Sequence, residues 1–180
     1  LADGSRIVAA IRGRDAIYIW TDTSLFVMRF VGAPFVFSFQ QVGTNCGLVG
    51  KNAAVEVDGV AYWMSENGFF RYTGKLESLA CLVEDYVYDD INTVPKNHIY
   101  AGLNNLFGEV TWFYPGSGAA SNNRSVTYNY MDSTLERPIW TTSSLARSSW
   151  SDSHIFGKPH ATEYDSSATS DATVGNTDGV

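Results

Sequence analysis

The chain has 180 residues, of which 44% are hydrophobic and 17% charged, and its formal net charge is −7. This length and composition are typical of a folded domain with its own core and argue against a disordered protein. Because no basic run accompanies the acidic balance, neither direct nucleic-acid binding nor attachment to an anionic membrane surface is expected. No apolar stretch approaches the roughly 20 residues of a membrane-spanning helix.

The first 40 residues consist of short apolar runs separated by polar or glycine-containing breaks. Aromatic and β-branched residues dominate these runs, which favours strands. The run Thr21–Ser24 is a turn signal between two of them. The predicted strands occupy residues 7–11, 16–20, 25–30 and 35–39.

A second unit with the same pattern follows. Asp58-Gly59 predicts a tight hairpin turn, and Ser65–Gly68 predicts another turn. The strands around these turns are predicted at 53–57, 60–64 and 69–72. In both units a strand with a tryptophan at or next to its last position precedes a polar turn and a strand rich in phenylalanine.

The tryptophans mark a repeat. Trp20 and Trp63 are 43 residues apart, and Trp112 follows Trp63 by 49 residues. A looser third unit contains strands at 108–114 and 125–130, joined by a Gly/Ser/Asn loop at 115–123. Fragments at 137–140 and 153–156 suggest a fourth unit.

Hairpins that recur every 40–50 residues are typical of β-propeller blades, because one small twisted sheet cannot bury both of its apolar faces. We therefore predict an all-β, β-propeller-like domain over residues 1–157, with three to four blades. Residues 158–180 are predicted as a Ser/Thr-rich irregular extension, and apolar spacing at 82–92 predicts one short helix. The residues expected to pack between blades are Trp20, Trp63, Trp112, Phe26, Phe70 and Tyr72.

The two ends of the sequence suggest whether the protein is longer than this chain. It begins at Leu1 without methionine and stops at Val180 in a turn-like run. We therefore expect it to be part of a longer protein, of which only some blades are present.

Candidate catalytic and metal-binding residues are few. The cluster Glu84, Asp85, Asp89 and Asp90 could hold paired carboxylates for glycoside hydrolysis, but its helical spacing favours the solvated face of a helix. The three histidines, His98, His154 and His160, have no metalloprotease spacing, and no G-x-S-x-G element is present. We predict no catalytic residue, no metal site and no cofactor.

Other motifs favour structural roles. Asp58-Gly59 and Asp22-Thr23 fit turns better than calcium loops, and Gly116–Gly118 lacks the GK[ST] ending of a phosphate loop. Cys46 and Cys81 are the only cysteines. They are predicted to be buried free thiols, although a disulfide is an alternative.

Several segments together resemble virion proteins of tailed bacteriophages, specifically the propeller-type tail hub or head-to-tail stabilisation proteins of short-tailed phages. The resemblance covers about residues 6–157 and rests on the pattern of strand and turn sequences, with no catalytic signature. It is carried by Arg12-Gly-Arg14, Trp20–Phe26, Gly43–Gly50, Tyr62–Tyr72, Asp85–Asn92 and Glu109–Tyr114.

This resemblance implies a structural protein of the phage tail that forms a hub, collar or adaptor through protein–protein contacts. It implies other tail proteins and a homo-oligomeric ring as partners, and DNA that passes without specific binding. It implies no cofactor, no catalytic residue and no membrane. The alternatives are a carbohydrate-binding or carbohydrate-cleaving propeller, in which the tryptophans would bind sugar, and a WD40-like cellular scaffold.

Overall fold

The structure is a computed structural model that describes residues 4–134, 136–152 and 158–163. Its architecture is all-β, as predicted, with antiparallel strands, one short α-helix and one 3-10 helix. The chain divides into two compact units, residues 1–80 and 81–180. The described residues include no helix with the length and apolar character needed to cross a membrane.

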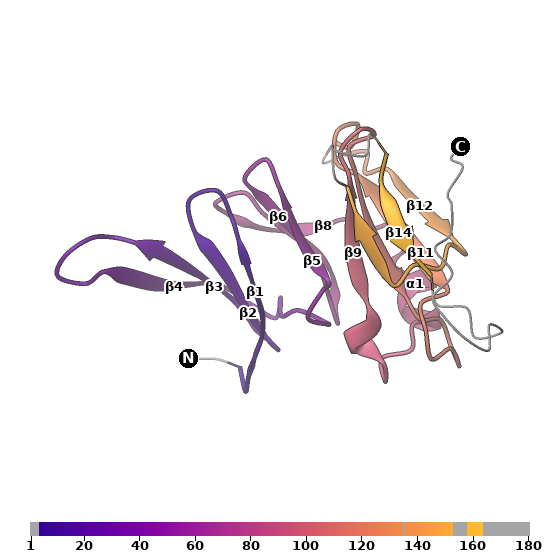
Figure 1. Cartoon of the computed structure of the whole chain (residues 1–180), viewed down its shortest axis with the longest axis horizontal. Helices are drawn as coiled ribbons and strands as arrows, with labels where there is room; N and C mark the ends of the chain where they lie inside the picture. Colours follow the sequence, from indigo (N-terminus) through magenta and orange to yellow (C-terminus); the bar gives the residue numbers. More distant parts are fainter. Residues whose placement is uncertain (1–3, 135, 153–157, 164–180) are drawn as a thin grey trace. The chain divides into compact units, whose positions relative to one another are not determined.

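The first unit contains two four-stranded sheets, each with its strands in sequence order (Figure 1). This meander is the topology of a propeller blade. The blade topology is therefore present in each sheet, while closure into a propeller stays a prediction. Sheet 1 consists of β1 (Ile7–Arg12), β2 (Ile17–Thr21), β3 (Ser24–Phe30) and β4 (Phe37–Thr44). Sheet 2 consists of β5 (Ala54–Val57), β6 (Val60–Ser65), β7 (Gly68–Tyr72) and β8 (Leu76–Leu79).

The turns of this unit form where the sequence predicts them. Asp58 and Gly59 join β5 to β6 with positive φ angles of 52° and 87°, which suit a two-residue hairpin turn. Between β2 and β3, the Thr21 hydroxyl oxygen accepts hydrogen bonds from the backbone N–H of Ser24 at 2.9 Å and of Thr23 at 3.2 Å. In a turn, the backbone N–H groups have no carbonyl partner on a neighbouring strand, and side-chain oxygens of this kind accept their hydrogen bonds instead.

Sheets 1 and 2 pack face to face through aromatic rings. Trp20 on β2 meets Trp63 on β6 with 5.4 Å between ring centroids, and Tyr18 meets Tyr72 at 5.6 Å. Both pairs have edge-to-face geometry, which aromatic quadrupoles favour. The first strands of the two sheets, β1 and β5, are also in contact.

The connection from β4 to β5 joins the two sheets. The Cys46 N–H donates to the Thr23 carbonyl in the β2–β3 turn, and the Leu48 N–H donates to the Thr21 carbonyl at the end of β2. The Cys46 carbonyl in turn accepts a 2.8 Å hydrogen bond from the Trp63 ring nitrogen in sheet 2. The connection is therefore part of the core of this unit.

The second unit begins with α1 (Glu84–Asp90) and the 3-10 helix η1 (Lys96–His98). The helix confirms the prediction at 82–92, although it is shorter. Its apolar contact is Val87, which is fully buried, whereas Leu82 and Tyr86 stay exposed.

Sheet 3 of this unit is another four-stranded meander. It consists of β9 (Tyr100–Asn104), β10 (Glu109–Tyr114), β11 (Arg124–Asn129) and β12 (Trp140–Ser143). One face carries Val110, Trp112 and Tyr128, all buried. The other face carries polar residues such as Thr111 and Thr127, whose hydroxyl groups are 2.8 Å apart.

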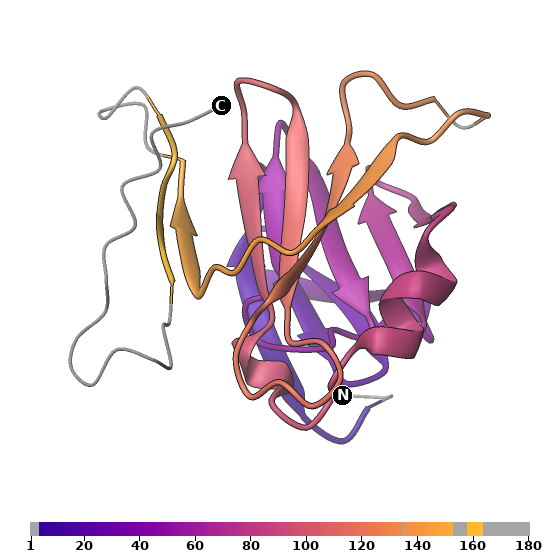
Figure 2. The ribbon, with the colours of Figure 1, turned by 90° about the vertical axis from the view of Figure 1, so that its right-hand side faces the viewer.

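A small sheet of β13 (Ser149–Ser151) and β14 (His160–Thr162) lies beside β9 (Figure 2). Trp150 packs on Phe113 at 5.7 Å, and its ring nitrogen donates a 2.6 Å hydrogen bond to the Leu103 carbonyl. A Cβ on Gly102 would lie 2.7 Å from the Trp150 ring, so the close approach requires glycine.

The structure corrects three predictions from the sequence. Trp140 does not begin a fourth unit, because β12 pairs with β11 and completes sheet 3. The predicted extension at 158–180 is not irregular throughout, because His160–Thr162 pair with β13. Besides β14, three strands were not predicted at all: β8, β9 and β13. The predicted strand at 153–156 and the extension beyond 163 lie outside the described residues.

Candidate interaction surface

The face of sheet 1 that points away from sheet 2 is apolar, and we call it the outer face. Side chains alternate along a strand, so the residues between Tyr18 and Trp20 and their cross-strand partners belong to this face. Ile19 pairs with Phe26, and Ile17 pairs with Met28. The apolar residues of this face along β2, β3 and β4 are Ile17, Ile19, Phe26, Met28, Phe30, Phe37 and Phe39; the same face also carries Gln41, opposite Phe26, and Arg12, opposite Ile17.

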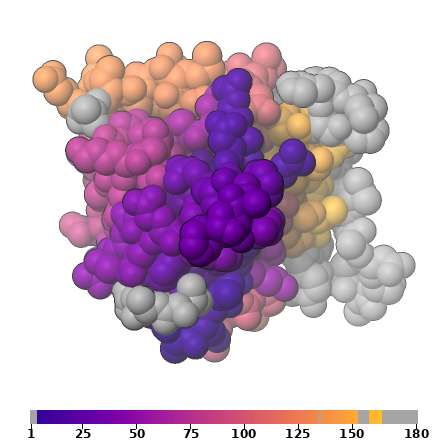
Figure 3. All heavy atoms as spheres, turned by 90° about the vertical axis from the view of Figure 1, so that its left-hand side faces the viewer, coloured from indigo at the N-terminus to yellow at the C-terminus, as the bar shows by residue number. Residues whose placement is uncertain are grey.

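The outer face continues onto the tip of the β3–β4 hairpin, residues 30–39, which we call the arm. Figure 1 shows this hairpin extending away from sheet 2, and Figure 3 shows its atoms projecting in front of sheet 1. Its large apolar side chains are exposed by about half or more: Phe30 73%, Val31 53%, Phe35 78%, Val36 49%, Phe37 50% and Phe39 62%. Phe30 and Phe37 pack on one another across the hairpin, with ring centroids 5.9 Å apart.

The arm lies in a part of the chain that has no carboxylate. The chain holds 19 Asp and Glu residues, yet none occurs between residues 23 and 55. The only charged residues in that stretch are Arg29 and Lys51. Exposed apolar surface without charge is unusual on a monomer and marks surfaces that bind other molecules.

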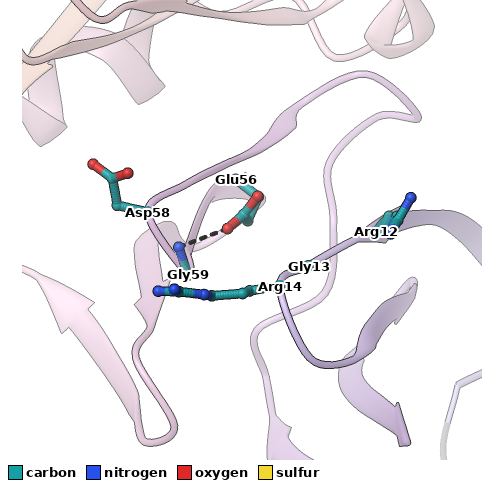
Figure 4. Close-up of a pocket in the computed structure, with 6 residues that line it drawn as sticks. All are labelled: Arg12, Gly13, Arg14, Glu56, Asp58 and Gly59. Carbon is teal, nitrogen blue, oxygen red and sulfur yellow. Dashed lines mark hydrogen bonds between the residues drawn. The ribbon is translucent and has the colours of Figure 1, made fainter. Parts of the chain in front are cut away.

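A shallow hollow of about 420 Å³ lies between two turns of the first unit (Figure 4). Arg12, Gly13 and Arg14 line it from the β1–β2 turn, and Glu56, Asp58 and Gly59 line it from the β5–β6 hairpin. The Glu56 carboxylate already accepts a 2.7 Å hydrogen bond from the Gly59 N–H. Two guanidinium groups and two carboxylates give the hollow no net charge, so it has no preference for an anion or a cation.

The acidic cluster predicted on the helix does not gather into one site. Asp85 and Asp89 are exposed, whereas Asp90 forms a 3.1 Å ion pair with Arg124. Asp90 also accepts a hydrogen bond from the Ser117 N–H. Asp90 therefore has a structural role in fastening the β10–β11 loop to α1.

Tyr114 lies close to this ion pair with its hydroxyl group buried. Burial, reinforced by the negative charge of Asp90, raises the pKa of the Tyr114 phenol to about 12. The Tyr114 hydroxyl has no hydrogen-bond partner within the described residues. A neutral phenol at physiological pH is consistent with a core residue.

The two histidines within the described residues, His98 and His160, lie in different elements. His98 places Nδ1 2.9 Å from the Ala120 carbonyl oxygen, His160 lies on β14, and His154 is outside the described residues. In the described part of the chain, no three His, Cys, Asp or Glu side chains are close enough to hold a metal ion.

The predicted packing residues take different places. Trp20, Trp63 and Trp112 occupy the second strand of their respective sheets and are fully buried. Tyr72 meets Tyr18 between sheets 1 and 2, and Phe70 stacks on Trp63 within sheet 2 at 5.7 Å. Phe26 is buried but belongs to the outer face, not to the contact with sheet 2.

The sequence reasoning missed the residues of the arm. The apolar run at 35–39 was predicted as a strand, and β4 does begin at Phe37. Two signals could have identified it: the consecutive apolar residues from 30 to 37, which do not alternate, and the absence of carboxylates around them.

Comparisons with known proteins do not identify a relative of this chain. No protein-family model and no curated protein matches this chain.

The two cysteines are free thiols, as predicted, with Cys46 fully buried and Cys81 half-buried. Burial raises the pKa of the Cys81 thiol from 9.0 to about 11. At pH 8.5 the folded protein should therefore contain roughly 100-fold less Cys81 thiolate than an unperturbed thiol would give. Iodoacetamide labelling read by mass spectrometry should be slow at both cysteines and fast in denaturant. Labelling of native Cys81 at the rate of a free cysteine would contradict this prediction.

Proposed function

We propose that this chain is a structural protein of a bacteriophage tail, where it serves as a hub, collar or adaptor through protein–protein contacts. The observation that carries the proposal is the arm together with the outer face of sheet 1. Four exposed phenylalanines on one projecting hairpin are an arrangement that supports binding to another protein.

The blade topology supports the same role. Three four-stranded meanders in series are the building blocks of a propeller, whose sheets bury one another's aromatic faces. Trp20 and Trp63 show this packing between sheets 1 and 2. Two sheets packed in this way suit a load-bearing structural protein, and the resemblance of residues 6–157 to tail hub proteins supplies the virion setting.

Other tail proteins and further copies of this chain are the proposed partners. The net charge of −7 suits a wall that DNA passes without adhering, because like charges repel. The proposal assigns neither an enzymatic reaction nor a cofactor to the chain.

The proposal predicts that the protein is a component of finished particles. Antibodies raised against the purified chain should label the tail in electron micrographs of particles from the phage whose genome encodes it. Mass spectrometry of the same purified particles should detect its peptides at a fixed ratio to other tail proteins. Serum depleted on the purified chain is the control. Recovery of the chain only from the lysate, and from no purified particle, would refute the proposal.

A further inference from the structure

We propose that the arm binds a second copy of this chain by lying across the outer face of sheet 1 in that copy, so that two copies exchange arms about a two-fold axis. This inference rests on the proposed function, because it names the partner of the same surface. It treats the arm and the outer face as the two halves of one self-complementary patch.

The chain itself shows what covers an apolar face of sheet 1. The inner face, with Tyr18 and Trp20, is covered by the aromatic residues of sheet 2. The outer face offers Ile17, Ile19 and Met28, which are half-buried side chains on a sheet with the same twist. Aromatic side chains from another sheet of the same kind would pack on it in the same manner, and the arm supplies such side chains.

The shape of the patch fits a two-fold contact. A two-fold contact requires that the same surface contain both the inserting group and its receptor. The outer face is continuous with the arm, because Met28 pairs with Phe39 and Phe30 pairs with Phe37 across β3 and β4. Because the hairpin extends away from sheet 2 (Figure 1), the arm is free to reach beyond its own sheet.

Electrostatics favours a second copy at this surface. Two chains that each carry −7 repel one another wherever their carboxylates meet. The stretch from 23 to 55 has no Asp or Glu, so two copies that meet through the arm bring no carboxylate of this stretch together. Arg29 lies at the base of the arm, so two copies would add little like charge to the contact.

The exposed area is sufficient for a specific contact. Exposed fractions of 50–78% on Phe30, Phe35, Phe37 and Phe39 correspond to roughly 500 Å² per copy, taking about 200 Å² for a fully exposed ring. Two copies would therefore bury about 1,000 Å² from these rings alone, which is the lower bound for a specific interface. Ile17, Ile19 and Met28 add to this area.

A lipid surface is the competing occupant of an apolar hairpin tip. Insertion in a membrane would use only the tip, around Phe35, and would leave the half-buried outer face without a role. The apolar surface instead runs continuously from Phe35 along the hairpin to Ile19. This continuity favours a second copy over a membrane.

The test compares the whole chain with an arm variant that carries Phe35→Ser and Phe37→Ser. Sedimentation equilibrium at about 1–100 µM should show the wild-type chain at twice its 19.8 kDa mass. The arm variant should dissociate about 100-fold or more readily, because interface aromatics dominate binding energy. Circular dichroism should show the same fold for both, since these side chains are exposed. Phe107→Ser is the matched control, because Phe107 is 61% exposed on a turn of the second unit and should leave the assembly unchanged.

Cross-linking tests the arm-on-face geometry itself. Copies with Phe35→Cys are mixed with copies with Ile19→Cys, both in a Cys81→Ser background. Mixed disulfide dimers should form faster than dimers within either population. Preferential cross-linking within one population would contradict the arm exchange.

Three results would overturn the inference: a monomeric wild type up to about 100 µM, a dimer that persists in the arm variant, or arm-dependent binding of the monomer to phospholipid vesicles. These results are separable from failure of the proposed function. A monomer that is still found in purified tails would refute only the arm exchange. A dimer that is absent from all particles would refute only the tail function.

Discussion

Replacing Trp20 or Trp63 by alanine is expected to lower the free energy of unfolding by about 3–5 kcal/mol. Both side chains are fully buried, and their rings meet between sheets 1 and 2 at 5.4 Å. Alanine would remove the largest apolar group from each sheet and leave a cavity that the two twisted sheets could close only in part. Denaturant titration followed by circular dichroism would measure the loss.

The double variant should lose less than the sum of the two single variants. Each single change already removes the ring contact, so the second change removes only what remains. The difference should be about 1 kcal/mol, which is typical of an edge-to-face aromatic pair. If the two losses add exactly, the contact between the Trp20 and Trp63 rings does not itself stabilise the fold.

Phenylalanine variants separate packing from hydrogen bonding at the same pair. Trp63 donates a 2.8 Å hydrogen bond to the Cys46 carbonyl, whereas the Trp20 ring nitrogen has no partner within the described residues. Trp63→Phe should therefore be more destabilising than Trp20→Phe by about 1–2 kcal/mol, because it leaves a buried carbonyl without its donor. Equal losses would argue against a role for this hydrogen bond.

Phe35→Ala is the control for all these variants. Phe35 is 78% exposed, so its loss should change stability by no more than about 0.5 kcal/mol in the monomer. The measurement is made in the Phe37→Ser background, where arm contacts between copies are already weakened. A loss of several kcal/mol there would show that the arm folds back on its own sheet.

The alternating strands and tight turns were predictable because their signals are local. β2, β6 and β10 each combine aromatic or β-branched residues with a polar turn nearby, and Asp58-Gly59 takes the backbone that its sequence favours. The recurrence of tryptophan on the second strand of each sheet made the repeat visible. These strands and turns can be predicted without knowing which residues pack on them.

The missed strands depend on tertiary contacts. β8 contains Glu77 and Ser78 and no β-branched residue, so it resembles a loop until it pairs with β7. β9 contains Gly102, which reads as a turn in sequence, yet here glycine makes room for the Trp150 ring. Local sequence propensity predicts a strand poorly at both places, because pairing with the neighbouring strand determines whether the segment is extended.

The same reasoning explains why Trp140 was assigned to a further unit. Ten residues separate β11 from β12, and the local pattern does not say whether the next strand returns to the same sheet. The stacking of Trp140 on Trp112 at 6.2 Å and on Tyr128 at 4.8 Å shows that it returns. The candidate interaction surface was missed for a related reason, since exposure of the arm depends on where the hairpin leaves the sheet.

Gly47→Ala is expected to destabilise the first unit by about 3 kcal/mol, because the connection between sheets 1 and 2 has no room for a methyl group. A Cβ at Gly47 would lie 2.1 Å from the Asp22 carbonyl oxygen and 2.6 Å from the Thr23 nitrogen. Both atoms belong to the backbone of the β2–β3 turn, so no side-chain rotation can relieve the clash. The connection would have to move away from the turn.

That movement would break contacts on both sides of the connection. The hydrogen bonds from Cys46 and Leu48 to the turn would lengthen, and the Cys46 carbonyl would shift relative to Trp63. Amide hydrogen exchange should therefore accelerate at Leu48 in the variant before the strands of sheet 1 unfold. Lys51→Ala, at an exposed position of the same connection, should change stability by no more than about 0.5 kcal/mol. If Gly47→Ala unfolds at the wild-type denaturant midpoint, the connection does not hold the two sheets together, and their aromatic contact must do so alone.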